Sequence, residues 1–387
     1  MGSEMCIRDR GNSLSKECLP LQLTLGSLVR YLNENGSDGK IMLYFMPETM
    51  GPCRFGQYRV FMELWLEKNE INNVALLSLN SENAYAGMGM HFKLRAWVAV
   101  IVADVLVDIE NAVKTLAKDR KEAERIMEGI KEKILCSLAN DSLPTFFRKL
   151  KKLMKLIEAV EKKAQYETTP KVLITGEIYV RKDEFSRKGL EDIFAENGII
   201  THISPVHEWI YYTDYLFLKR YTSPDSTKLE RMYKKLEVLV KKYIERKIKD
   251  IFARSGVYEP HMVNVEHTIE AAEKYLNPSL TGEAILTVGT AISEVGERYD
   301  GIISIGPFGC MPSRISEAII KHGIEEMKKT AQGLMKNIFR DLGDVPVIFI
   351  ESDGNPFTPI IENRIEAFMV QVKRLREYKN SLLHQTL

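Results

Sequence analysis

Three of the five cysteines in this chain share one kind of local setting. Cys53 follows an apolar run and precedes an amphipathic period in MPETMGPCRFGQYRVFMELWLE, and Cys310 has the same setting in YDGIISIGPFGCMPSRISEAII. Cys18 comes just before an apolar helical period that starts at Pro20. Each is predicted to lie at a helix N-terminus, where backbone N–H groups and the helix dipole favour a thiolate over a thiol.

These three cysteines could bind a metal together, because loops that follow parallel strands meet at one edge of a sheet. Thiolates select zinc or iron–sulfur. A structural zinc site normally uses four ligands with closely spaced cysteine pairs, and the sequence has no C-x-x-C pair. An iron–sulfur cluster held by only three cysteines would leave one iron open as a Lewis acid. The alternative reading is three unrelated cysteines in tight turns.

The other two cysteines are set apart from this group. Cys136, in GIKEKILCSLAN, is expected to pack in the core with Ile130, Ile134 and Leu138. Cys6 lies in MGSEMCIRDR, residues 1–10, which resemble translated adapter sequence and are excluded from the fold. The natural chain is therefore expected to extend further upstream.

Composition narrows the class of protein. A chain of 387 residues that is 45% hydrophobic can bury a large core and favours two domains. The net charge of +1 gives no reason to expect nucleic acid or a membrane surface as partner. The sequence shows neither a secretory signal nor a spanning segment, and irregularly spaced cysteines are typical of a reducing compartment, so a cytoplasmic protein is expected.

Strand-like runs that alternate with helical periods predict an α/β fold with parallel sheets. The predicted strands are 41–47, 74–80, 172–180, 199–205, 301–307 and 345–352. A long helical region spans 93–165, and YETTP leads into a boundary at 167–170. The predicted division is a first α/β lobe at 11–166, which includes the helical region, and a second at 171–387. The second contains a charged helical insertion at 226–254, expected to be a solvated face.

Several sequence blocks resemble one known family. They are KECLPLQLTLG, FMPETMGPCRFGQY, ITGEIYVRKDEFS, NPSLTGEAILTVG, GPFGCMPSR and ESDGNPFTPIIENRIEAFMVQ. They are similar to the iron–sulfur component of the 2-hydroxyacyl-CoA dehydratase and benzoyl-CoA reductase family. The likeness is strongest to the dehydratase-like carboxyl region of long acyl-CoA dehydratase activase proteins. It runs in order from about residue 11 to about residue 373.

The resemblance implies two Rossmann-like lobes with a 4Fe–4S cluster in the crevice between them. Its ligands would be Cys18, Cys53 and Cys310, with a double-cubane cluster as the alternative. The family implies a separate ATP-hydrolysing activator that supplies one low-potential electron for anaerobic metabolism. The expected activity is that of a dehydratase-like lyase or an ATP-dependent reductase component, acting on an acyl-CoA or another small molecule. A dimer is one open assembly.

Departures from the family keep a second function open. The chain lacks a glycine-rich phosphate loop, so ATP binding is expected upstream or on another chain. The region 219–249 matches stand-alone dehydratases poorly, which leaves a thioester pocket undefined. The rival interpretation is a non-catalytic electron relay or scaffold region of a larger activase protein.

A few polar residues are weaker candidates. Arg54 could bind cluster sulfides or an acyl-CoA phosphate, or pair with a neighbouring carboxylate. Glu208, beside His207 after a predicted strand, could act as acid or base, although a helix cap is favoured. The ESDG turn after the last strand is expected to direct carboxylates towards the crevice. No residue is assigned a catalytic role.

Overall fold

The structure is a computed structural model that describes residues 17–35, 39–48, 53–78 and 89–386. The segment 1–10 that resembles adapter sequence, with Cys6, lies outside the described residues. The elements in chain order are α2 (Leu19–Asn35), β1 (Met42–Phe45), the 3₁₀ helix η1 (Arg54–Gln57), α3 (Tyr58–Lys68), β2 (Val74–Leu77), α4 (Gly89–Leu116), α5 (Arg120–Asn140), α6 (Leu143–Glu158), β3 (Lys171–Gly176), α7 (Ile178–Lys182), α8 (Glu184–Arg187), α9 (Leu190–Glu196), β4 (Ile200–Ile203), α10 (His207–Leu218), α11 (Lys228–Phe252), η2 (Ala253–Ser255), α12 (Val265–Ala272), η3 (Pro278–Leu280), α13 (Ala284–Glu294), β5 (Gly301–Pro307), α14 (Met311–Thr330), α15 (Gly333–Leu342), β6 (Val347–Ser352) and α16 (Pro359–Thr386).

Each of the six predicted strand regions contains a strand, so the expectation of an α/β fold with parallel sheets is confirmed at that level. The third predicted strand ends earlier than expected. β3 stops at Gly176 because the side chain of Glu177 accepts the backbone N–H of Val180 and caps α7. A capping carboxylate of this kind starts a helix at the residue after it.

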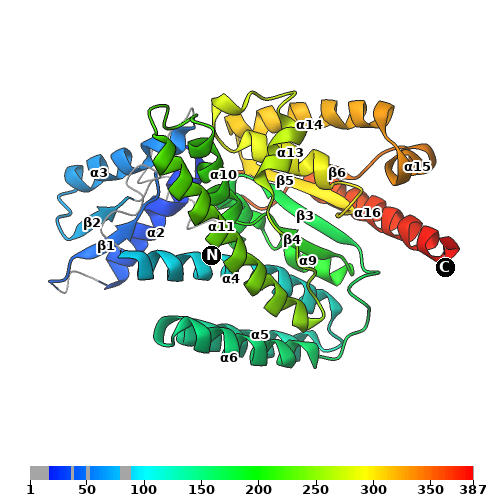
Figure 1. The fold of residues 1–387 in the computed structure, drawn as a ribbon, viewed down its shortest axis with the longest axis horizontal. Coiled ribbons are helices and arrows are strands. Elements are labelled where there is room, and N and C mark those ends of the chain that lie inside the picture. Colours follow the sequence, from blue (N-terminus) through cyan, green and yellow to red (C-terminus); the bar gives the residue numbers. More distant parts are fainter. Residues whose placement is uncertain (1–16, 36–38, 49–52, 79–88, 387) are drawn as a thin grey trace.

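The larger sheet has four parallel strands in the order β4–β3–β5–β6. β3, β4 and β5 are buried at every residue, as expected for parallel strands covered on both faces. Neighbouring residues of one strand belong to different cores. Val172 and Ile174 pack with α9 and α16, whereas Leu173 packs into the large core on the other face. Figure 1 shows this sheet between its two helical layers.

The smaller sheet pairs β1 with β2 in parallel, from Met42 opposite Val74 to Phe45 opposite Leu77. α2 and α3 cover one of its faces through Leu25, Met62 and other apolar side chains. The alternate side chains of β1 stay exposed, because the strand has an apolar residue at nearly every position while only one face is covered. In Figure 1 this sheet lies apart from the larger one.

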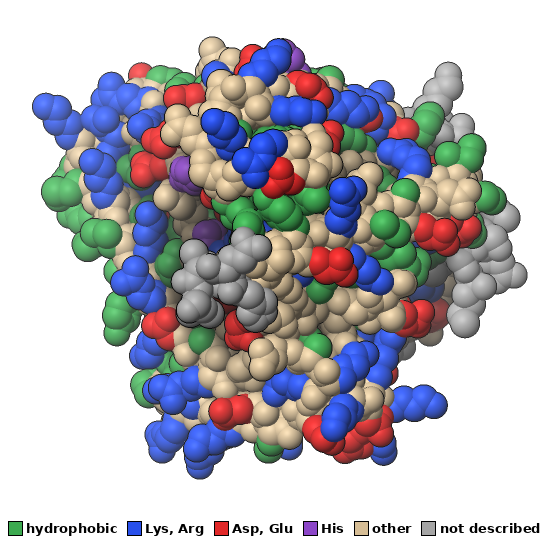
Figure 2. All heavy atoms as spheres, turned by 90° about the vertical axis from the view of Figure 1, so that its right-hand side faces the viewer, with side chains coloured by type: hydrophobic (Ala, Val, Ile, Leu, Met, Phe, Trp, Pro, Cys, Tyr) green, Lys and Arg blue, Asp and Glu red, His purple; other side chains and the backbone are tan. Residues whose placement is uncertain are grey.

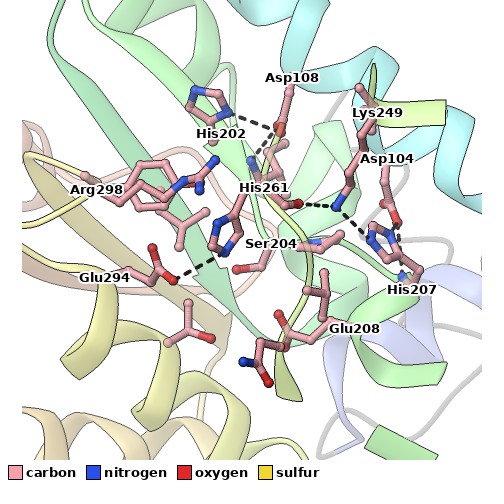
Figure 3. Close-up of a pocket in the computed structure, with 18 of the residues that line it drawn as sticks. Asp104, Asp108, His202, Ser204, His207, Glu208, Lys249, His261, Glu294 and Arg298 are labelled. Carbon is pink, nitrogen blue, oxygen red and sulfur yellow. Dashed lines mark hydrogen bonds and ion pairs between the residues drawn. The ribbon is translucent and has the colours of Figure 1, made fainter. Parts of the chain in front are cut away.

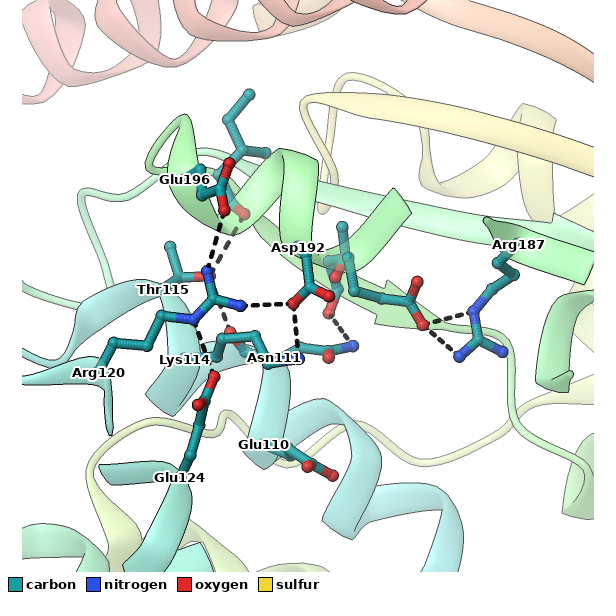
Figure 4. A network of polar contacts seen from close by, with 12 residues as sticks. Glu110, Asn111, Lys114, Thr115, Arg120, Glu124, Arg187, Asp192 and Glu196 are labelled. Atoms are coloured by element: carbon teal, nitrogen blue, oxygen red, sulfur yellow. Dashed lines mark hydrogen bonds and ion pairs between the residues drawn. The ribbon is translucent and has the colours of Figure 1, made fainter. Parts of the chain in front are cut away.

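The helical region α4–α6 packs with the larger sheet, although the sequence had assigned it to the first lobe. Buried side chains of all three helices join the core that contains Leu173 and Ile200. Ion pairs also connect these helices to α9, since Asp192 contacts Lys114 at 2.8 Å and Arg120 at 2.5 Å (Figure 4). The expected boundary at 167–170 therefore does not separate this region from the second part of the chain.

The charged insertion forms α11, and Thr227 closes its N-terminus with a capping box to Glu230. Its carboxyl half is buried, with Ile248 and Phe252 in the large core. Its amino half leaves a row of apolar side chains exposed, namely Leu229, Met232, Tyr233, Leu236, Leu239, Val240 and Tyr243. The expectation of a solvated charged face is thus correct only for the lysines and glutamates between these residues.

The molecular surface mixes charges of both signs. Figure 2 shows Lys and Arg side chains interspersed with Asp and Glu on one face, in keeping with the net charge of +1. Among the helices of the described ranges, none combines the length and the apolarity needed to cross a membrane.

Candidate functional site

The three candidate cysteines each come directly before a helix, as predicted. Cys53 is the N-cap of η1, which runs into α3, and Cys310 is the N-cap of α14. Cys18 precedes α2, and its carbonyl oxygen accepts the N–H groups of Leu21 and Gln22 at 3.0 and 3.2 Å. Pro20 and Pro312 help to set this position for Cys18 and Cys310, because proline fits the first turn of a helix, where no N–H partner is needed.

Cys310 lies at the point of the larger sheet where ligands usually bind. β3 and β5 are neighbours, but the chain leaves β3 towards β4 and leaves β5 towards β6, so the connections diverge to opposite sides. Open α/β sheets bind ligands beyond the carboxyl ends of the strands at such a switch point. Glu177 follows β3 and donates its backbone N–H to Ile305 at 2.9 Å. Glu177 and Cys310 therefore flank the switch point.

The other two cysteines lie in the same region, as the electrostatics of the thiols show. The pKa of Cys18 is raised to about 12, mainly by burial and also by Glu177, Cys310 and Cys53. Burial also raises the pKa of Cys53 and of Cys310, again with a contribution from Glu177. Coulomb interactions weaken with distance and with solvent screening, so the three sulfurs and this carboxylate occupy one neighbourhood.

The same pKa directions correct the expectation of thiolates. Burial outweighs the helix N-termini, so all three groups are thiols in the metal-free protein at neutral pH. Each sulfur nevertheless receives a hydrogen bond that favours its anionic form. The donors are the hydroxyl of Tyr58 to Cys18, the backbone N–H of Phe55 to Cys53, and the N–H and hydroxyl of Ser313 to Cys310.

Two buried glutamates and an arginine form the wall beside the cysteines. Arg181, 2% exposed, donates to the carbonyl of Gly176 at 2.9 Å and contacts Glu283 at 3.3 Å. The pKa of Glu283 is raised to about 8, mainly by burial and also by Glu177, against the opposing effect of Arg181. Burial likewise raises the pKa of Glu177. The wall therefore places Arg181 beside two carboxyl groups whose protonated forms are favoured by burial.

The sequence interpretation missed these two glutamates, although a signal was present. The tripeptide Thr-Gly-Glu occurs twice, at 175–177 and 281–283, and each copy ends at a helix N-cap.

The glycine of the first copy, Gly176, has φ +106°, and a Cβ there would lie 2.1 Å from the carbonyl oxygen of Ile305. Only glycine allows this close approach of β3 and β5.

The weaker candidates have mixed outcomes. Arg54 is exposed and lowers the pKa of the adjacent Cys53. Glu351 of ESDG accepts the N–H of Gly309 at 3.3 Å and pairs with Arg314 at 3.3 Å, so it stabilises the loop that carries Cys310.

Cys136 is exposed rather than packed in the core. Its Cα is two residues from the buried Ile134, which places it on the opposite side of the helix.

The donor set fits a cluster better than a single ion. In the described part of the chain, no group of three His, Cys, Asp or Glu side chains is arranged to hold one metal ion. A 4Fe–4S cluster makes a different demand, because each thiolate binds its own iron and the ligands stand further apart. Three thiols with hydrogen-bond donors at their sulfurs are the donor type that such a cluster takes, since such bonds tune cluster potential.

Glu208 lines a polar pocket of about 90 Å³ that is open to solvent (Figure 3). It is bounded by α4, the carboxyl end of β4, the first turn of α10, α13 and the segment 258–264. Glu208 and His207 line it, as do Ser204 and Arg298. None of the three candidate cysteines does.

Comparison with known protein families, with curated proteins and with solved structures found no match to this chain. The assignment of function therefore depends on the geometry described above and on the sequence resemblance.

Proposed function

We propose that this chain is an iron–sulfur component that accepts a low-potential electron from an ATP-hydrolysing activator and uses it for reductive or dehydrating chemistry. The observation that carries the proposal is the grouping of Cys18, Cys53 and Cys310 at three helix starts beside the switch point of the larger sheet. The proposed substrate class is a 2-hydroxyacyl-CoA or related thioester. The two sheets would belong to two Rossmann-like lobes of a cytoplasmic protein.

The cysteines would hold a 4Fe–4S cluster, which supplies one-electron transfer and an open iron that acts as a Lewis acid. A double-cubane cluster is the alternative. The residues of the chain have separate tasks in this proposal. Tyr58, Phe55 and Ser313 donate hydrogen bonds to the sulfurs and so favour the thiolates needed for binding. Glu177 and Glu283 have raised pKa values, so each would lower the reduction potential only in its ionised form.

A low potential is the reason to invoke an activator. A cluster bound by three anionic thiolates in a buried setting resists reduction by mild donors. An electron delivered with ATP hydrolysis overcomes that resistance. The helix N-termini at the three cysteines act in the opposite direction, so the measured potential decides which effect is larger.

A redox titration of the anaerobically purified protein, followed by EPR, tests the proposal. We expect the cluster to stay oxidised with ascorbate and to show a reduced-cluster signal only after addition of an acyl-CoA dehydratase activase, ATP and dithionite. The matched control omits ATP. Full reduction by ascorbate alone would refute the activator-driven function.

The second candidate is an electron relay or scaffold region without catalysis. One observation favours it: the polar pocket described above is lined by none of the three cysteines. A relay predicts that cluster reduction proceeds normally but that no acyl-CoA changes the EPR spectrum. A catalyst with an open iron predicts that substrate binding shifts the g-values.

A further inference from the structure

Two polar side chains in the pocket of Figure 3 are buried without a partner. The hydroxyl of Ser204 makes no hydrogen bond within the described ranges, although the residue is only 1% exposed. Glu208 is 6% exposed and makes neither a salt bridge nor a side-chain hydrogen bond to the part of the chain that the structure describes. A buried polar group without a partner costs about 1–3 kcal/mol. Proteins tolerate this cost where a ligand completes the bonding.

The pocket also contains Arg298, which forms a hydrogen bond with Tyr299 and interacts electrostatically with Glu294 and Glu259. Arg298 lines it and makes no ion pair within the described residues. Its Nη2 donates to the carbonyl of Glu259 at 3.5 Å, and its guanidinium lies 5.6 Å from the ring centre of Tyr299. A guanidinium presents a planar pair of donors that matches a carboxylate. Arg298 can therefore receive one.

The other charged groups of the pocket are already occupied. Lys249 donates to Glu245 at 2.6 Å and to the carbonyl of His261 at 2.5 Å. His207 bonds Asp104 through Nδ1 at 2.7 Å, and its backbone N–H bonds the same carboxylate at 3.1 Å. These contacts fix the first turn of α10 and so hold Glu208 in place at the pocket wall.

His261, which Figure 3 shows between Arg298 and Ser204, adds no positive charge at neutral pH. Partial burial, with its side chain 47% exposed, and the nearby Arg298 lower its pKa to about 4. The pocket therefore brings together Arg298, the carboxyl groups of Glu208 and Glu294, and the hydroxyl of Ser204.

We propose that this pocket binds a small organic carboxylate whose carboxyl group pairs with Arg298 and whose neighbouring hydroxyl or amino group bonds to Glu208 and Ser204. The site is built by this chain alone and does not depend on the iron–sulfur function. Its ligand differs from a CoA thioester because the group that Arg298 would hold is a free carboxylate.

Binding of acetate, glycolate and glycine to the metal-free protein tests the proposal by calorimetry and ligand-observed NMR. These probes share a carboxylate, and the last two add a hydroxyl or an ammonium group. We expect glycolate or glycine to bind at least tenfold more tightly than acetate, and whichever is tighter identifies the neighbouring group. Equal binding of all three, or no binding, would overturn the proposal.

Variants assign the contacts. Arg298→Gln should weaken every probe at least tenfold, whereas Glu208→Gln and Ser204→Ala should reduce the tighter probe to the affinity of acetate. The matched controls are Arg125→Gln and Glu132→Gln, two exposed residues of α5. Unchanged binding in Arg298→Gln would overturn the assignment. The contact with Arg298 can also be tested without a variant. Phenylglyoxal modifies arginine, and mass spectrometry shows whether the tighter probe protects Arg298 from it in the unmodified protein. We expect protection, and its absence would count against the proposed contact.

Discussion

Gly306 sets how closely the cysteine-bearing helix α14 approaches the sheet, and Gly306→Ala tests this role. A Cβ at this position would lie 2.1 Å from Oγ and 2.9 Å from Cβ of Ser313. Both distances are well below van der Waals contact. The hydroxyl could rotate away, but the Cβ of Ser313 moves only with the backbone of the first turn of α14.

The cost of this change follows from the geometry. Overpacking of a buried site costs about 1–3 kcal/mol when the backbone must shift, and rotation of Ser313 also removes a hydrogen bond to Cys310. We expect Gly306→Ala to lose about 1–3 kcal/mol of unfolding free energy in urea and to incorporate less iron. The double variant Gly306→Ala/Ser313→Gly removes the clashing atoms and should recover most of the stability but not the iron uptake.

The matched control is Gly129→Ala in α5, where an added Cβ meets nothing within 4 Å. This substitution should be neutral or stabilise by up to about 1 kcal/mol through helix propensity. The reasoning fails if Gly306→Ala is as stable as the unmodified protein, or if removing the Ser313 side chain restores nothing.

Three further predictions concern charge and burial elsewhere in the fold. Asp300→Asn should cost about 3–5 kcal/mol in urea unfolding, because the fully buried carboxylate pairs with Arg376 at 2.8 Å; a loss under about 1 kcal/mol would contradict this. Burial keeps Glu283 protonated in the folded state up to a pKa of about 8, so folding should weaken from about pH 4.3 towards pH 8, and Glu283→Gln should flatten that decline. An unaltered pH profile would show that this group is ionised when folded. Cys136→Ser, an exposed change, should shift unfolding by less than about 0.5 kcal/mol and retain all iron; iron loss would reassign the ligands.

The strands and the helix starts were predictable from local patterns. Runs of branched apolar residues mark β3 and β5 because both faces of these strands are buried. A proline within two residues of Cys18 and Cys310 marks the first turn of the helix that follows each cysteine. Both signals act over a few residues, which is the range that a single sequence reveals.

The partners of the helices were not predictable in the same way. The apolar faces of α4–α6 showed that these helices are buried but not against which sheet, so their assignment to the first lobe followed only from chain order. The error at Cys136 came from counting it with the apolar face that includes Ile134, although residues two apart point to opposite sides of a helix. The carboxylate pocket joins Ser204 to Arg298, and only tertiary packing brings them together.

The central claim is that Cys18, Cys53 and Cys310 hold one iron–sulfur cluster. Anaerobic reconstitution with iron and sulfide, followed by iron and sulfide analysis and Mössbauer spectroscopy, tests it most directly. We expect about four irons per chain, as in a cubane cluster, in the unmodified protein and in Cys136→Ser, and loss of the cluster signal in Cys18→Ser, Cys53→Ser and Cys310→Ser. A full cluster in any of those three variants, or none in the unmodified protein, would contradict the claim.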